Sequence, residues 1–262
     1  MLPIEGEILV WISHFALILT RHAAVFTVSP VLGRANVPNM TKIMLSVMLT
    51  FVILPLHPPP AVMPFPTMYH FLFAMFGELA VGLILGFLNT LFFSIVFTTG
   101  QMIDTQIGFG MVQVYDVQSN IQIPVVGSLF NLVVLLTFLV SNGHIKLIYL
   151  LSRTFETIPV GQASFSVEIV PVIVESFARS FALAVNIALP IVAAGLLAEI
   201  SLGIIVRTAP QMNVFVVGIP IKIIIGLAVL ALVVPLFVAM TGRIFDEMFA
   251  AMDSLFGVMA VT

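Results

Sequence analysis

The residues with the clearest chemical potential are ionisable side chains set among apolar ones. Glu78, Glu199 and Arg207 each lie at or near the edge of a long apolar stretch, where a charge is costly and usually faces a partner or a cavity. Glu199 and Arg207 are about two helical turns apart and share a face if the helix continues. Such groups can relay protons or ions. No further chain of acids and histidines surrounds them, so we favour a structural ion pair or a contact to a neighbouring subunit.

Two histidines in the first apolar stretch are the next candidates. His14 and His22, with Arg21 beside the latter, would need more ligands at matched spacing to bind a metal. The chain has no cysteine, which excludes disulfides and thiol catalysis. The sequence contains no metalloprotease, serine hydrolase or phosphate-loop motif. We therefore predict a protein that is not an enzyme and has no cofactor and no metal, with these side chains on a helix that faces other protein.

A third group of polar residues lies between two membrane-length apolar runs. Residues 79–103 and 117–145 contain no Asp, Glu, Lys or Arg, and each run is long enough to cross a hydrocarbon core of ~30 Å as a helix. The segment Gly100–Pro124 is rich in Gly and Gln and makes poor lipid-facing material. We expect irregular backbone here at or near membrane depth, where it must be satisfied by protein or by a water-filled cavity.

The side chains of this segment support two interpretations. Its glutamines supply donors and acceptors without fixed charge, and Phe109, Met111 and Val114 supply apolar surface. An apolar constriction can gate a path by excluding water. Alternatively, the segment is a buried linker whose glutamines bond neighbouring helices. The residues alone leave both interpretations open.

The composition restricts the class of protein that positions these residues. The chain has 262 residues, of which 61% are hydrophobic and 8% charged, against about 25% charged in soluble domains. Its mean hydropathy is +1.22. A net charge of −3 with nine Lys and Arg argues against nucleic-acid binding. We predict an integral membrane protein, or one that is almost wholly buried among partners.

The pattern predicts an all-α protein whose helices are often interrupted by Pro or Gly. Gly82 and Gly86 predict a close helix–helix seam. Residues 243–259 predict an amphipathic helix that lies against a partner or a membrane surface. The other expected helices cover residues 7–28, 42–54, 68–99, 124–140, 144–157, 167–206 and 214–240.

Several short motifs are specific through their order and spacing, and they extend over nearly the whole chain. They are Arg21 with Pro30-Val-Leu-Gly33 and Pro38; Gly77-Glu78 with Gly82 and Gly86; Gly100-Gln101; Gln106-Ile-Gly-Phe-Gly110; Asp116-Val-Gln-Ser-Asn120; Asn142-Gly143-His144; Ala198-Glu199-Ile-Ser-Leu-Gly203-Ile-Ile-Val-Arg207-Thr-Ala-Pro210-Gln211-Met-Asn213; and Gly218-Ile-Pro220-Ile-Lys222. With these motifs the chain resembles the FliR family of the flagellar type III export apparatus and its injectisome counterparts.

The resemblance implies a membrane-type fold of kinked helical hairpins with an inserted central plug loop. It implies a FliP-like part, 1–165, and a FliQ-like part, 166–262, within a helical hetero-oligomeric gate. The implied partners are several copies each of FliP and FliQ, together with FlhB, FlhA, unfolded export substrates and membrane lipid. The implied location is the bacterial inner membrane at the flagellar basal body.

The resemblance also assigns roles to residues. Some relatives have phenylalanines where this chain has Met111 and Val114, and others have glycine where it has Asp104. The channel plug falls on Gly108, Phe109, Gly110, Met111, Val112 and Val114; loop support falls on Gln101, Asp104, Gln106 and Asp116; subunit packing or ion pairing falls on Arg21, Glu78, Gly82, Gly86, Glu199 and Arg207.

Two other functions are compatible with the residues. Broken helices also suit a secondary transporter for a small solute, which would show inverted internal symmetry and polar groups at the midplane. A membrane scaffold without a path of its own is the third interpretation. Flagellar and injectisome systems are equally compatible with the motifs.

Overall fold

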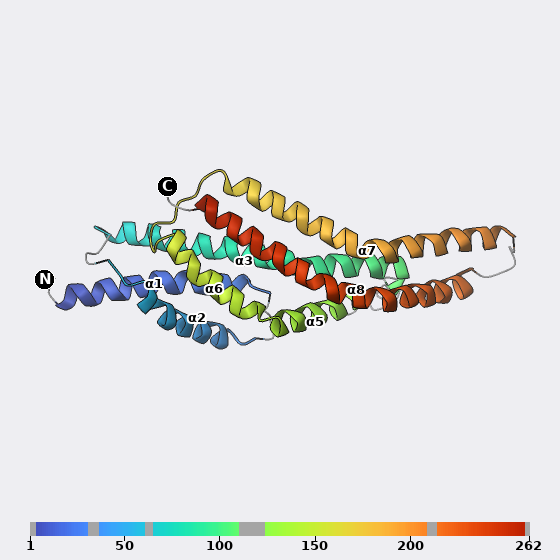
Figure 1. Ribbon diagram of the computed structural model, residues 1–262, viewed down its shortest axis with the longest axis horizontal. Helices are drawn as coiled ribbons and strands as arrows, with labels where there is room; N and C mark the ends of the chain where they lie inside the picture. Colours follow the sequence, from blue (N-terminus) through green and yellow to red (C-terminus); the bar gives the residue numbers. More distant parts are fainter. Residues whose placement is uncertain (1–3, 31–36, 61–64, 110–123, 209–213, 260–262) are drawn as a thin grey trace. The chain divides into compact units, whose positions relative to one another are not determined.

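The computed structural model describes residues 4–30, 37–60, 65–109, 124–208 and 214–259. This part of the chain is helical and contains no strand, which confirms the predicted all-α class (Figure 1). Its elements are α1 (Ile4–Val28), α2 (Asn39–Ile53), the 3-10 turn η1 (Leu54–Leu56), α3 (Met68–Ile107), α5 (Val125–Val140), α6 (Gly143–Thr157), α7 (Ile169–Thr208) and α8 (Val214–Met259).

Three helices are much longer than a membrane crossing requires. α3 and α7 have 40 residues each and α8 has 46, about twice the ~20 residues that cross a bilayer. By length and composition, five helices of the described residues are long and apolar enough to cross a membrane. The helices therefore make this a membrane protein, as predicted.

The chain forms two compact units, each assembled from separate stretches of sequence. The first unit contains Met1–Leu91, Asn142–Ser176 and Glu247–Thr262, and the second contains Phe92–Ser141 and Phe177–Asp246. Because α3, α7 and α8 are long, each contributes residues to both units. The division into parts 1–165 and 166–262 stays a prediction from the resemblance.

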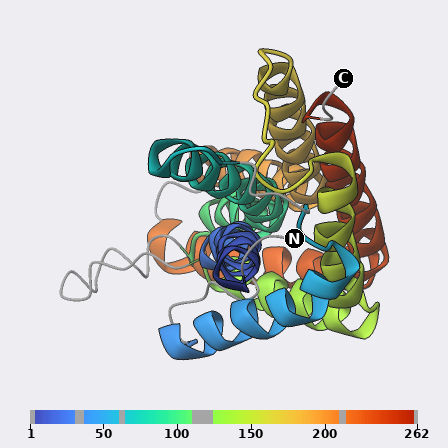
Figure 2. The same cartoon turned by 90° about the vertical axis from the view of Figure 1, so that its left-hand side faces the viewer.

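The first unit is built around α1. Figures 1 and 2 show α2 lying alongside α1, and the ring of His22 contacts the hydroxyl of Thr50 over 3.1 Å between these helices. Leu17 and Ile18 of α1 are fully buried. The face of α1 that carries the polar residues is therefore enclosed by its own chain.

The second unit has an aromatic core that joins α3, α5 and α8. The rings of Phe130 and Phe237 stack with their centroids 4.1 Å apart. The ring of Phe138 meets those of Phe93 and Phe245 edge-on, at 5.4 Å and 5.2 Å. Offset and edge-on aromatic pairs add stability beyond the area that they bury, so α5 is held firmly between its neighbours.

The break between α5 and α6 was predicted correctly from a dipeptide. Asn142 adopts φ 58°, the left-handed conformation that asparagine tolerates better than most residues. Gly143 then begins α6. The chain can stop one helix and start another here without a long loop.

Two expectations about helix extent are wrong. Residues 100–107 are helical, so irregular backbone does not begin at Gly100. Residues 243–259 do not form a separate helix, because α8 runs unbroken to Met259. The apolar stripe of this last stretch is buried in the chain itself: the ammonium of Lys146 on α6 lies over the ring of Phe249, 4.3 Å from its centroid.

Candidate functional site

α3 ends immediately before the stretch that we call the central segment, residues 108–124. The N–H of Gly108 donates to the carbonyl of Asp104 over 3.0 Å, and Gly108 has φ 99°. Glycine is the usual residue just past a helix end, because positive φ strains residues that carry a Cβ. The structure thus places Gly108 at the point where α3 stops and the central segment starts.

The other end of the central segment is also bonded to Asp104. α5 begins at Val125, and the side chain of Pro124 gives it no cap. Instead, the carboxylate oxygens of Asp104 accept from the N–H of Val126 over 3.2 Å and 3.3 Å, and Val125 also donates to this carboxylate. Asp104 is buried. It therefore supplies from α3 the acceptor that the first turn of α5 requires.

Small residues let α3 approach its neighbours closely at this level. A side chain at Gly100 would collide with the backbone of Gly127 on α5. The hydroxyl of Thr99 donates to the carbonyl of Ala184 on α7 over 3.1 Å. The last turns of α3 are consequently fixed to α5 and to α7 at once.

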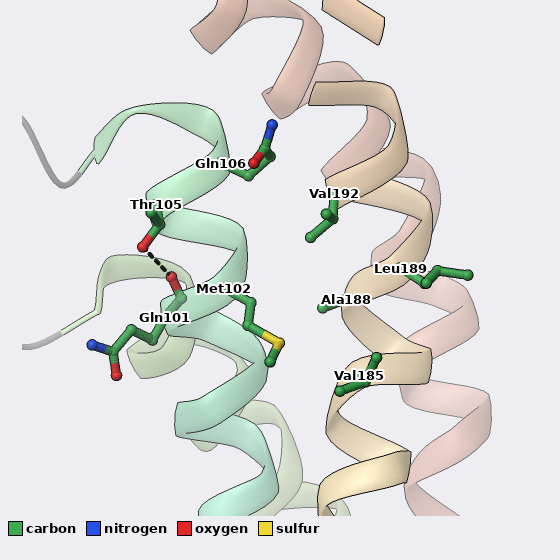
Figure 3. A pocket seen from close by; sticks show the side chains of 8 residues that line it. All are labelled: Gln101, Met102, Thr105, Gln106, Val185, Ala188, Leu189 and Val192. Atoms are coloured by element: carbon green, nitrogen blue, oxygen red, sulfur yellow. Dashed lines mark hydrogen bonds between the residues drawn. The ribbon is translucent and has the colours of Figure 1, made fainter. Parts of the chain in front are cut away.

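A cavity of about 430 Å³ lies between α3 and α7 in the second unit. Figure 3 shows Met102 pointing from α3 toward α7, while Val185 and Val192 point back toward α3. Gln101 points away from α7 in this view, and its carbonyl accepts from the hydroxyl of Thr105 over 2.8 Å. The lining is largely apolar, which suits apolar groups better than a charged solute. The lining residues are Gln101, Met102, Thr105, Gln106, Val185, Ala188, Leu189 and Val192.

Gln106, another of the predicted support residues, faces α7 and its residue Glu199. It lies against Gly195, where a Cβ would fall 2.8 Å from Nε2 of Gln106, and it borders the carboxylate of Glu199. That amide nitrogen is buried and has no hydrogen-bond partner of good geometry among the described residues. Glu199 itself accepts from the ammonium of Lys222 on α8 over 2.9 Å. The partner of Glu199 is thus Lys222 and not Arg207.

In the first unit, Arg21 and Glu78 form a fully buried ion pair. The guanidinium donates to both carboxylate oxygens of Glu78, to the hydroxyl of Thr154 and to the carbonyl of Ile158. The N–H of Gly161 donates to Glu78 over 2.8 Å. We call these five residues the Arg21 cluster. Such a buried pair is stable only when its remaining donors and acceptors are satisfied. Every nitrogen of the guanidinium and both oxygens of the carboxylate have a hydrogen-bond partner here.

The predicted seam glycines lie beside this cluster, on the face of α3 that meets α1. A Cβ at Gly82 would fall 2.5 Å from the carbonyl oxygen of Arg21 and 2.6 Å from the side chain of Ala24. A Cβ at Gly86 would fall 2.9 Å from the side chain of Val28. Both positions therefore need glycine for α1 to approach α3 closely enough for Arg21 to reach Glu78.

The two histidines of α1 are engaged separately. His14 donates through Nε2 to the carbonyl of His57 over 2.8 Å, and His22 contacts Thr50. The described residues include no group of three or more His, Asp or Glu that could hold a metal ion. The arrangement matches polar side chains that face other parts of the protein.

The remaining predicted residues belong neither to the Arg21 cluster nor to the contacts of Asp104 and Gln106. Arg207 is exposed near the end of α7, and Phe109 is half-buried directly after Gly108. The predicted residues that lie outside the described part of the chain are Gly110, Met111, Val112, Val114 and Asp116.

The sequence reasoning missed Lys222, Thr154 and Gly161 as partners of charged groups. Lys222 had a detectable signal, because it is the lone base in a long apolar run. The hydroxyl of Thr154 and the backbone N–H of Gly161 carried no such signal. They become partners only through the way the chain folds.

Comparison with known proteins identifies the family. The family described as bacterial export proteins, family 1, matches residues 12–248. The chain belongs to this family. It is 30% identical to the flagellar biosynthetic protein FliR of Escherichia coli (strain K12) over 95% of both chains. It is 31% identical to that of Bacillus subtilis (strain 168), over 95% of this chain and 96% of the relative.

A relative from another system matches a shorter part of this export protein. The surface presentation of antigens protein SpaR of Shigella sonnei is 32% identical over 62% of each chain. The family match covers most of α1, all of α2 to α7 and most of α8. Both the Arg21 cluster and the residues around Asp104 therefore lie within the part that defines this export family.

Proposed function

We propose that this chain is a subunit of the flagellar type III protein export gate, which forms a channel with FliP and FliQ and passes unfolded flagellar substrates across the inner membrane. The observation that carries the proposal is the family match over residues 12–248, together with two FliR relatives that align over 95% of the chain. A match over this length covers both structural units and is not confined to a single helix.

The surface of the second unit supports a place among other membrane components. Leu197 and Ile204 on α7 and Leu232 on α8 are each more than half exposed. Exposed apolar side chains on helices of this length suit contact with lipid or with protein. FliP and FliQ are the proposed protein neighbours, with FlhB and FlhA as further contacts at the basal body.

We further propose that the central segment forms the seal of this channel. Phe109, Met111 and Val114 would supply an apolar constriction that blocks water and small ions. The support for this assignment is positional: α3 and α5 present both ends of the segment at one place, next to Asp104. Gln101, Gln106 and Asp116 would hold the segment from its polar side.

Co-expression tests the assembly. We expect the chain to accumulate and purify only with FliP and FliQ, and to restore swimming and export of flagellar proteins to a strain that lacks its own copy. A chain that purifies alone as a stable monomer or homo-oligomer, and leaves export unrestored, would instead support a transporter.

Conductance of the purified complex tests the seal. Replacing Phe109, Met111 and Val114 together with Gly should increase ion leak across planar bilayers, because the apolar constriction is lost. A complex that assembles normally and conducts no more than the wild type would rule out a seal at these residues while leaving the assembly proposal intact.

A further inference from the structure

Asp104 is bonded to both helix ends that flank the central segment. The backbone carbonyl of Asp104 accepts from Gly108, where α3 ends. The side chain of Asp104 accepts from Val126, in the first turn of α5. Both ends of the central segment are therefore bonded to the same residue.

α5 depends on this remote acceptor because its own sequence provides none. The residue before α5 is Pro124, which has no side-chain acceptor and makes no cap. The first N–H groups of a helix need partners, and a carboxylate there is also favoured by the helix dipole. The partners of the Asp104 side chain in the described residues are backbone N–H groups of α5.

The surroundings show that the arrangement is built and not incidental. Asp104 is 4% exposed, so its charge is withdrawn from solvent and must be satisfied by these N–H groups. One turn earlier, Gly100 allows the backbone of Gly127 to approach α3. A Cβ at Gly100 would collide with this backbone and force the start of α5 away from α3.

We propose that Asp104 is a positioning residue for the gate: it ties the start of α5 to the end of α3 and so fixes the distance between the two ends of the central segment. This inference rests on the proposed function, because the consequence of the tie is a well-placed seal. Asp104 touches neither substrate nor ion in this proposal. It acts through the two helix ends.

The test uses the purified complex with FliP and FliQ and three variants. Asp104→Ala removes the carboxylate bonds to α5 and leaves the backbone bond to Gly108, whereas Asp104→Asn keeps one side-chain carbonyl acceptor without the charge. The double variant Asp104→Ala with Pro124→Ser gives α5 a cap of its own, because serine is a good N-cap residue, but does not restore the link to α3. Asp253→Ala is the matched control, since it removes a half-exposed carboxylate elsewhere.

The first readout is amide exchange at the start of α5, which does not depend on gating. We expect Asp104→Ala to speed exchange of Val126 by about 5- to 30-fold, the effect of losing a helix cap. Asp104→Asn should give a smaller increase. The double variant should return to near the wild-type rate, and Asp253→Ala should not differ from the wild type.

The second readout, ion leak, separates a tie from a simple cap. If Asp104 links the two helix ends, leak should rise in Asp104→Ala and stay raised in the double variant, although α5 is capped again. A leak that returns to the wild-type level in the double variant overturns the proposal, because capping alone would then be the role of Asp104. An unchanged leak in Asp104→Ala overturns it as well.

Assembly failure has its own interpretation. If Asp104→Ala does not join the complex, Asp104→Asn carries the test, and unchanged exchange and leak in that variant contradict the tie. If the wild-type chain itself forms no complex with FliP and FliQ, the proposed function has failed, which is a different result from failure of the tie.

Discussion

The Arg21–Glu78 pair of the first unit and the Lys222–Glu199 pair of the second unit differ sharply in burial. In the first unit, the Arg21–Glu78 pair is fully buried, with no exposed side-chain surface on either partner, and every group of the cluster finds a donor or acceptor. In the second unit, the side chain of Lys222 is 17% exposed and that of Glu199 is 57% exposed. The two ion pairs therefore differ in how far they are withdrawn from solvent.

The difference follows from what surrounds each pair. Arg21 on α1 bonds to α3 and to the end of α6. Its partner Glu78 also accepts from the turn at Gly161, so the pair joins four segments of the first unit. Lys222 and Glu199 join only α8 and α7. We infer that losing the Arg21–Glu78 pair disturbs more of its unit than losing the Lys222–Glu199 pair.

The largest effect should come from breaking the buried pair on one side. Glu78→Ala leaves the Arg21 guanidinium buried without its carboxylate, which typically costs about 3–5 kcal/mol. We expect the variant to accumulate poorly and to lower the unfolding temperature of the complex in detergent by many degrees. Thermal unfolding followed by size-exclusion chromatography measures it.

A double replacement sharpens this result. Arg21→Met with Glu78→Leu removes both charges and keeps apolar volume, so it should recover much of the lost stability. If the double variant is as unstable as Glu78→Ala, the cost comes from lost bonds to Thr154, Ile158 and Gly161 and not from an unpaired charge.

The second effect should come from the seam that brings α1 to α3. Gly82→Ala places a Cβ 2.5 Å from a backbone oxygen of α1, and backbone cannot move aside as a side-chain end can. Overpacking of this kind typically costs about 1–3 kcal/mol. Reduced accumulation and a lower unfolding temperature are expected, with the loss of the Arg21–Glu78 contact as the cause.

Gly203 provides the matched control for the seam. It lies within α7 of the second unit, and a Cβ there meets no atom within 4 Å. Gly203→Ala should leave stability unchanged or raise it slightly, because alanine favours helix over glycine. Equal losses in both variants would show that the glycines matter for a reason other than close approach within the chain.

The fold was predictable where local residue types decide it. Asn142 marks the break between α5 and α6. The spacing of Phe249 and Met252 also predicts an apolar helical stripe, although the expected contact with a partner or a membrane surface is wrong, because the chain itself buries both side chains. Gly82 and Gly86 were identified because small residues four apart have few other uses in an apolar helix. In these cases the signal lies within a few neighbouring residues.

The errors arose where a distant contact decides the outcome. Gly100 was expected to begin irregular backbone, yet α3 continues through it, and the glycine instead makes room for the backbone of Gly127 on α5. Glu199 looks like a partner for Arg207 on the same helix, but Lys222 on α8 is its actual partner. Neither contact has a local pattern, so sequence reading could nominate Asp104 and Gln106 as support without identifying what they contact.

The smallest effect should come from the exposed pair of the second unit. Lys222→Ala removes the partner of Glu199, and exposed pairs typically contribute about 0.2–1 kcal/mol. The unfolding temperature of the complex should therefore change little, in contrast to Glu78→Ala. Exchanging the charges, with Glu199→Lys and Lys222→Glu, should restore whatever stability is lost.

A drop in unfolding temperature as large as that of Glu78→Ala would erase the contrast between the two ion pairs. It would mean that FliP, FliQ or another neighbour buries this pair in the proposed gate.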